Sequence, residues 1–323
     1  MPETAVPPAR FPKLNAGYRM VFSPGRLSIG LVVPIEAYAS TSVPSLAQHL
    51  ERVQLAEALG FSAVWLRDVP FDVPSFGDAG QLFDPFVYLG ALAMQTQAIA
   101  LGVASIILPL RHPAHVAKAA ASADVLSNGR LLLGIASGDR PEEYPALDVP
   151  FDQRGRRFRD SYAYIRQVAE SRPQVRNAFG DVTGDMDLLP KPVAGKLPLL
   201  ITGASQQDPA WLAAHGDGWI TYPRPVAQQA RFIRELRARA ATGGAPERPV
   251  MEPLYIDLAE RPDAPPQPLH LGFRLGIDAL RSYLEARQAI GVNHVALNLR
   301  FNRLDPRLTL ERLAEALLPD FTH

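Results

Sequence analysis

The sequence has no cysteine. Disulfides, thiolate metal sites, iron–sulfur clusters and a cysteine nucleophile are therefore excluded, although this leaves the redox compartment undetermined. The sequence also has no excess of charge, because 33 Lys and Arg residues balance 33 Asp and Glu residues. No overall field attracts nucleic acid or an anionic membrane surface, and we expect neither of them as a partner.

Long apolar runs are absent as well. No run approaches the roughly 18 residues that a membrane span needs. The first twenty residues contain no apolar core of a signal peptide. The resulting expectation is a cytoplasmic protein.

The motifs of several common sites are also missing. The chain contains no GxGxxG fingerprint, no Walker loop and no GxSxG elbow, so a Rossmann-type nicotinamide site is not predicted. His112 and His115 form an isolated HxxH pair, without a second pair or a carboxylate at ligand spacing nearby. We therefore predict no metal site.

From residue 27 onward, short apolar runs alternate with helical patterns, as in parallel sheets whose strands are connected by helices. The expected strands are 27–34, 62–66, 99–108, 131–136, 199–202, 219–220, 251–258 and 294–297. This alternation predicts an α/β fold, a single (β/α)8 TIM barrel over residues 27–323, with its site at the carboxyl ends of the strands. The proline-rich residues 1–26 are predicted to form an N-terminal arm, and residues 174–189 an insertion or hairpin before strand 5.

The first helix of the barrel is expected to begin near Pro44 and to end at Gly60. Its apolar residues, beginning with Leu46, would face the strands.

Very small residues interrupt two strands that should be neighbours. Ala104 and Ser105 lie in the third strand, and Ala136, Ser137 and Gly138 end the fourth. Without bulky side chains, these positions would form a low surface on which a flat ring rests against peptide groups. A flavin has such a ring.

Two segments have the composition of an anion site. In Gly203-Ala204-Ser205-Gln206, small residues lead from a buried strand into a helix, whose free N–H groups and the Ser205 hydroxyl would hold a phosphate. The alternative is ordinary helix capping by Ser205 or Asp208. Arg154, in the first turn of another helix, is a second candidate phosphate ligand, and surface ion pairs with preceding acids are its alternative.

The long loop that follows the second strand begins with Arg67 and Asp68. Loops of this length in a compact domain are often functional. These two side chains would contact substrate or the ring, or else form a structural salt bridge at the end of the strand.

The chain resembles the bacterial luciferase-like flavin-dependent oxidoreductases, which are (β/α)8 barrels that use FMN or the deazaflavin F420. The resemblance covers residues 27–321. The segments that carry it, in chain order, are AEALGFSAVWLRD, LGVASIILPLRHPAHVAKAAASADVLSNGRLLLGIASGDRPEEY, VPFDQRGRRF and ITGASQQDPAWLAAHGDGWI.

The resemblance implies roles for individual residues. Ala104-Ser105 matches a non-proline cis peptide beneath the flavin ring, and Ala136 and Ser137 match positions that face the ring. Ser205, flanked by Ala204 and Gln206, matches a phosphate-binding serine. Arg154 lies near the position of a phosphate-binding arginine.

The sequence also departs from the family pattern in two places. Val69 follows Asp68 where the luciferase α chain and many deazaflavin enzymes have a histidine, so the usual acid–base group is absent. Ser137 stands where the luciferase α chain has an arginine.

The resemblance implies an FMN-dependent monooxygenase of a two-component type, which receives reduced FMN from a separate flavin reductase and oxygenates a small organic substrate. The alternatives are an F420-dependent hydride-transfer enzyme and a non-catalytic flavin-binding protein. From their positions at strand ends, Glu36 and Tyr222 would line the substrate side with Arg67 and Asp68, the latter as a proton-transfer group. Since family members are often dimers, we expect a homodimer.

Overall fold

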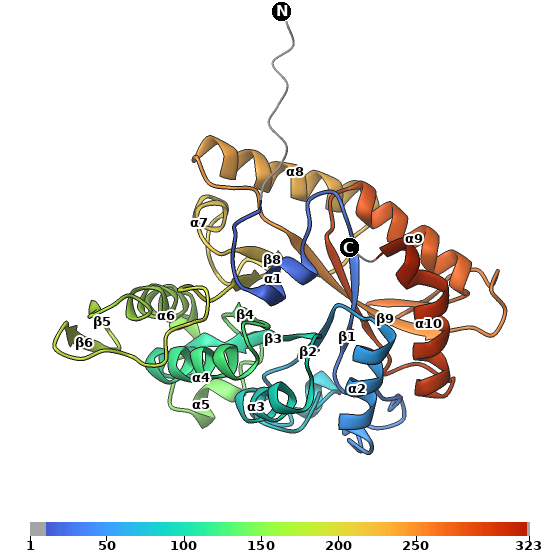
Figure 1. Cartoon of the computed structure of the whole chain (residues 1–323), viewed down its shortest axis with the longest axis horizontal. Helices are drawn as coiled ribbons and strands as arrows, with labels where there is room; N and C mark the ends of the chain where they lie inside the picture. Colours follow the sequence, from blue (N-terminus) through green and yellow to red (C-terminus); the bar gives the residue numbers. More distant parts are fainter. Residues whose placement is uncertain (1–10, 322–323) are drawn as a thin grey trace, which may run out of the picture.

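A closed barrel of parallel strands forms the centre of the molecule in a computed structural model that describes residues 11–321 (Figure 1). The strands are β1 (Ser28–Val32), β2 (Ala63–Leu66), β3 (Ala100–Ile107), β4 (Leu131–Ala136), β7 (Leu199–Thr202), β8 (Gly218–Ile220), β9 (Val250–Leu258) and β12 (His294–Asn298). Each pairs in parallel with the next, and β12 pairs with β1 to close the ring. The predicted TIM barrel is confirmed.

Helices surround the strands on the outside (Figure 1). They are α2 (His49–Leu59), α3 (Pro85–Gln95), α4 (Pro113–Leu126), α6 (Arg154–Val168), α7 (Pro209–Ala214), α8 (Val226–Thr242), α9 (Ile277–Ala289) and α10 (Pro306–Phe321). A short helix, α5 (Glu143–Ala146), follows β4. Among residues 11–321, no helix combines the length and apolarity needed to cross a membrane.

The predicted start of α2 is wrong. The helix begins at His49, and Leu46 precedes it with φ +54°. The reason is that the carboxylate of Glu36 accepts hydrogen bonds from the N–H groups of Ser45 at 2.8 Å and Leu46 at 3.0 Å. These bonds hold the segment in a turn, so the helix starts later.

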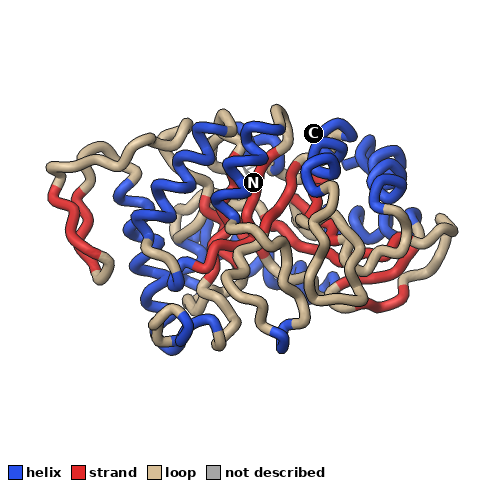
Figure 2. Tube along the Cα trace, turned by 90° about the horizontal axis from the view of Figure 1, so that it is seen from below, coloured by secondary structure: helices blue, strands red, loops and turns tan. Residues whose placement is uncertain are grey.

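The insertion before the fifth barrel strand is a hairpin of β5 (Gln174–Asn177) and β6 (Gly180–Thr183), which projects away from the barrel (Figure 2). A second insertion was not predicted. In it, β10 (Gln267–Leu269) and β11 (Gly272–Leu275) form another hairpin, and β11 pairs with the carboxyl-terminal half of β9. This second hairpin therefore stands at the end of the barrel where the site is expected.

Residues 11–26 of the predicted arm pack into the barrel, while the rest of the arm lies outside the described residues. Helix α1 (Ala16–Val21) lies against the starts of β3 and β4. The Tyr18 hydroxyl donates to the carbonyl of Asp217 at 2.6 Å, and the N–H of Gly17 donates to the carbonyl of Gly129 at 2.9 Å. With Tyr18 and Phe22 buried against interior side chains, this segment plugs the amino-terminal end of the barrel.

Candidate active site

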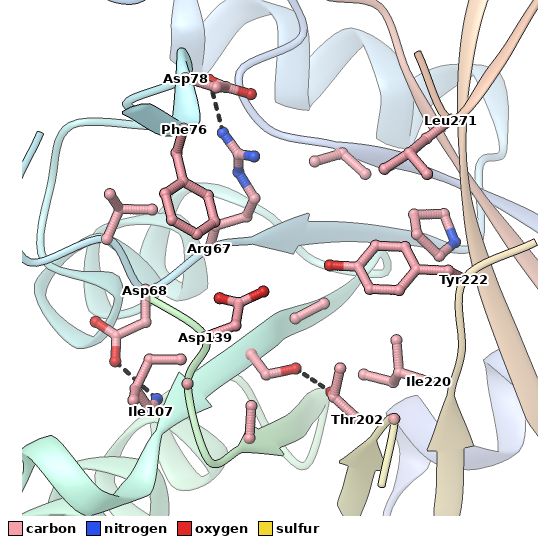
Figure 3. A pocket seen from close by; sticks show the side chains of 18 of the residues that line it. Arg67, Asp68, Phe76, Asp78, Ile107, Asp139, Thr202, Ile220, Tyr222 and Leu271 are labelled. Atoms are coloured by element: carbon pink, nitrogen blue, oxygen red, sulfur yellow. Dashed lines mark hydrogen bonds and ion pairs between the residues drawn. The ribbon is translucent and has the colours of Figure 1, made fainter. Parts of the chain in front are cut away.

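A cavity of about 730 Å³ opens at the carboxyl ends of the strands (Figure 3). Its lining includes most of the side chains that the sequence singled out. These are Arg67, Asp68, Ala104, Ser105, Ala136, Ser137, Gly203, Ala204, Ser205, Gln206 and Tyr222. The loops after several strands therefore bring together residues that are far apart in the sequence.

The floor of the cavity consists of small side chains. The Ala104–Ser105 peptide bond is cis, as the resemblance implied, and the Ser105 hydroxyl hydrogen-bonds the hydroxyl of Thr202. Beside it, a Cβ on Gly134 would lie 2.3 Å from the carbonyl oxygen of Val103, so only glycine allows β3 and β4 to approach this closely. The result is a flat surface of backbone and methyl groups.

The turn between β7 and α7 supplies the candidate phosphate site. Gly203, Ser205 and Gln206 all have positive φ angles, between +44° and +60°. Among the described residues, the N–H groups of Ala204, Ser205 and Gln206 donate to no acceptor. Successive backbone N–H groups in such a turn form a concavity that suits an anion.

Capping of α7 does not require Ser205. Asp208 is the N-cap and accepts from the N–H groups of Ala210 at 3.0 Å and Trp211 at 2.9 Å. The Ser205 hydroxyl instead donates to the carbonyl of Thr202 at 2.8 Å and stabilises the turn. Of the two alternatives left open by the sequence, capping belongs to Asp208, and the turn remains available to a ligand.

Arg154 is outside the cavity lining. Its guanidinium folds back, donates to the carbonyl of Phe151 at 2.9 Å and stacks on the Phe151 ring at 3.7 Å. The next residue, Gly155, packs against Gln206. The first turn of α6 therefore supports the candidate phosphate turn through its backbone, and the Arg154 side chain points elsewhere.

Glu36 is also outside the lining, contrary to its predicted place on the substrate side. Its carboxylate is occupied by the N–H groups of residues 45 and 46, and Arg52 lies 3.7 Å away. Its position at the end of a strand therefore did not predict its surroundings, because the following segment folds back and its N–H groups bind this carboxylate. Tyr222 does line the cavity and is half-exposed there.

Asp68 forms the structural salt bridge that was one of its two predicted roles. Its carboxylate accepts from Arg111 at 2.7 and 3.0 Å and from the N–H of Ile107 at 3.0 Å. Three donors hold a side chain that is almost entirely buried. Asp68 therefore anchors the end of β3, which is poor geometry for the predicted proton-transfer role.

Arg67 is paired with a residue that the sequence analysis passed over. One guanidinium nitrogen of Arg67 lies 2.9 Å from Asp78, and Arg300 approaches the other carboxylate oxygen of Asp78 at 3.1 Å. All three side chains line the cavity. Arg300 follows the last barrel strand, so only the closure of the barrel brings it beside Arg67.

Two acidic side chains of the cavity were also missed. Asp139 is exposed to the cavity and forms no hydrogen bond or ion pair with another described residue (Figure 3). Glu143 is buried, and Arg140 is 3.8 Å away. Burial raises the pKa of Glu143 to about 7, with Arg140 opposing the rise and Asp68 and Asp139 adding to it. Their position directly after β4 is the sequence signal that could have identified them.

The chain is similar in sequence to known oxidoreductases. Residues 22–259 match a family model described as luciferase-like monooxygenase. An F420-dependent hydroxymycolic acid dehydrogenase of Mycobacterium tuberculosis is 27% identical over 68% of this chain and 59% of its own length. The oxygenase component of a flavin-dependent trigonelline monooxygenase from Acinetobacter baylyi is 30% identical over 52% of this chain and 42% of its own.

Among solved structures, monooxygenase RslO1 from Streptomyces bottropensis has a similar fold. It superposes with a TM-score of 0.74 at 20% identity, covering 91% of this chain and 100% of that one. This likeness supports the barrel described above.

Proposed function

The chain belongs to the luciferase-like monooxygenase family and is an oxidoreductase, and from this premise we propose that it is an FMN-dependent monooxygenase of the two-component type. The observation that carries the proposal is the flat floor around Ala104-Ser105, next to a turn in which the N–H groups of residues 204–206 have no acceptor among residues 11–321. The floor suits a planar ring, and the turn suits a phosphate. FMN carries both groups, so these residues fit it.

The residues of the chain would bind the cofactor, orient it and keep it from bulk water. Ala104, Ser105 and Ala136 would support the ring, and the amides of residues 204–206 would hold the phosphate. Reduced FMN supplies the electrons with which O₂ is activated, and we propose that a separate flavin reductase delivers it. The protein then places the substrate above the ring.

Asp139 is our candidate for moving a proton in place of the missing histidine at Val69. It is an acidic side chain in the cavity without a partner among residues 11–321, whereas Asp68 is held by three donors. A general acid–base group contributes roughly 10²- to 10⁴-fold to a rate. Asp139→Asn should therefore reduce kcat by that factor and leave FMN binding unchanged. Glu142→Gln, an exposed neighbour, is the control.

A second candidate function is F420-dependent hydride transfer. The dehydrogenase relative matches more of this chain, 68%, than the trigonelline monooxygenase relative, 52%. Titration of the purified protein with FMN, reduced FMN and F420, followed by measurement of oxygen uptake, separates the two. Tight binding of reduced FMN with oxygen uptake supports the first proposal. Preferential F420 binding with turnover in the absence of O₂ supports the second, and binding of neither cofactor would overturn both.

A further inference from the structure

Two arginines share one carboxylate at the mouth of the cavity. Arg67 lies 2.9 Å and Arg300 3.1 Å from opposite oxygens of Asp78. Among residues 11–321, the other hydrogen bonds to the Asp78 carboxylate come from neutral donors, the Tyr38 hydroxyl at 3.0 Å and the N–H of Gly80 at 2.9 Å. This group therefore has two positive charges and one negative charge in a largely buried place.

No other acid in the described residues compensates this excess by direct contact. Asp68 pairs with Arg111, and Glu143 pairs with Arg140. Asp139 faces the same cavity but forms no ion pair with Arg67 or Arg300. A buried excess of positive charge is costly, and an anion that enters the cavity would reduce that cost.

The surroundings of these arginines are aromatic and flat. The Arg300 guanidinium lies over the rings of Tyr38 at 5.1 Å and Phe301 at 5.4 Å, and its Nη2 donates to the carbonyls of Gly77 and, at 3.3 Å, of Thr41. Its buried Nε has no hydrogen-bond partner among residues 11–321 and is left for a ligand. Phe301 also contacts Tyr255, with ring centroids 5.4 Å apart, and both line the cavity. The free Nε–H can donate to a carboxylate, and the adjoining rings suit a planar apolar body.

We propose that this cationic and aromatic face, formed by Arg67, Arg300, Tyr255 and Phe301, binds the acidic group of the substrate, and that the substrate is a small aromatic carboxylate. The inference rests on the proposed function, because it assumes that the floor of the cavity belongs to the cofactor. In that arrangement the carboxylate faces the arginines, and the body of the substrate extends over the ring toward Asp139.

Binding of benzoate and its neutral isostere benzamide to the cofactor-free protein, measured by calorimetry, tests the proposal. We expect benzoate to bind at least about tenfold more tightly, since a charge-assisted contact distinguishes the two probes. Arg300→Gln should reduce the preference to less than about twofold. Arg300→Lys, which keeps the charge, should retain part of it and guards against loss of the fold. Arg303→Gln is the control, because Arg303 is exposed, pairs with Asp257 and lies outside the cavity lining.

Equal binding of the two probes, no binding of benzoate at millimolar concentration, or an equal loss in Arg303→Gln would overturn the proposal. Titration of the same variants with FMN keeps this outcome separate from the proposed function. If FMN binds all variants normally but benzoate is not preferred, only the substrate class is wrong. If FMN fails to bind the wild-type protein, the proposed function fails, whatever the benzoate result.

Discussion

We compare the stability of Glu143→Gln with that of the wild-type protein at different pH values. The variant should gain stability relative to the wild-type protein as the pH rises from acid to neutral. Glu143 is 3% exposed, and burial raises its pKa from an ordinary 4.5 to about 7. Between these two pH values the unfolded chain has released this proton, whereas the folded chain still holds it. The free energy of unfolding of the wild-type protein therefore falls as pH rises through this window, by at most roughly 3 kcal/mol. Glutamine does not titrate and loses this dependence.

Urea unfolding of both proteins between pH 4.5 and 8 measures the effect. The difference in unfolding free energy should shift progressively in favour of Glu143→Gln up to about pH 7 and then remain constant. Contributions from other titrating groups are common to both proteins and largely cancel in the difference. Glu142→Gln, at an exposed neighbouring position, is the control for the loss of a carboxylate from this segment. A pH-independent difference for Glu143→Gln would refute the assigned burial effect.

Two further changes test the framework of the barrel. Asp217→Asn should destabilise the fold by about 3–5 kcal/mol in urea unfolding, because it leaves the positive charges of Arg166 and Lys196 without their buried partner; a loss below roughly 1 kcal/mol would contradict this role. Gly102→Ala places a methyl group 2.2 Å from a ring carbon of Trp65, so we expect a loss of at least roughly 1–3 kcal/mol and altered Trp65 fluorescence. Unchanged stability and fluorescence would count against the packing described for the barrel interior.

The barrel was predictable because each of its parts is determined locally. Buried parallel strands need apolar runs, and helices need caps such as Asp84, which accepts from the N–H groups of residues 86 and 87 as its position before Pro85 suggests. The start of α2 was not predictable in this way. It depends on Glu36, a side chain ten residues before Leu46. The Glu36 carboxylate accepts the hydrogen bond of the Leu46 N–H and so holds Leu46 outside the helix.

The residues of the candidate site also differ in how well the sequence predicts them. The small residues of the floor and of the turn after β7 can be recognised in the sequence, because a flat surface and a tight turn both need residues without bulky side chains. Charged residues were harder to interpret, since a carboxylate or guanidinium takes whichever partner the fold brings near. Thus Asp68 pairs with Arg111, Arg154 folds back on its own turn, and Arg300 reaches Arg67 only across the closed barrel. The homodimer stays a prediction, which light scattering would test.

The plug formed by α1 determines the route by which ligands enter and leave. Because Tyr18 and Phe22 fill the amino-terminal end, the floor around Ala104-Ser105 is closed from beneath. A cofactor on that floor and a substrate above it would therefore share the mouth of the cavity at the carboxyl ends of the strands. On the proposed function, the substrate would bind after the cofactor and the product would leave before it, so substrate that binds first would block the cofactor's path and inhibit the enzyme.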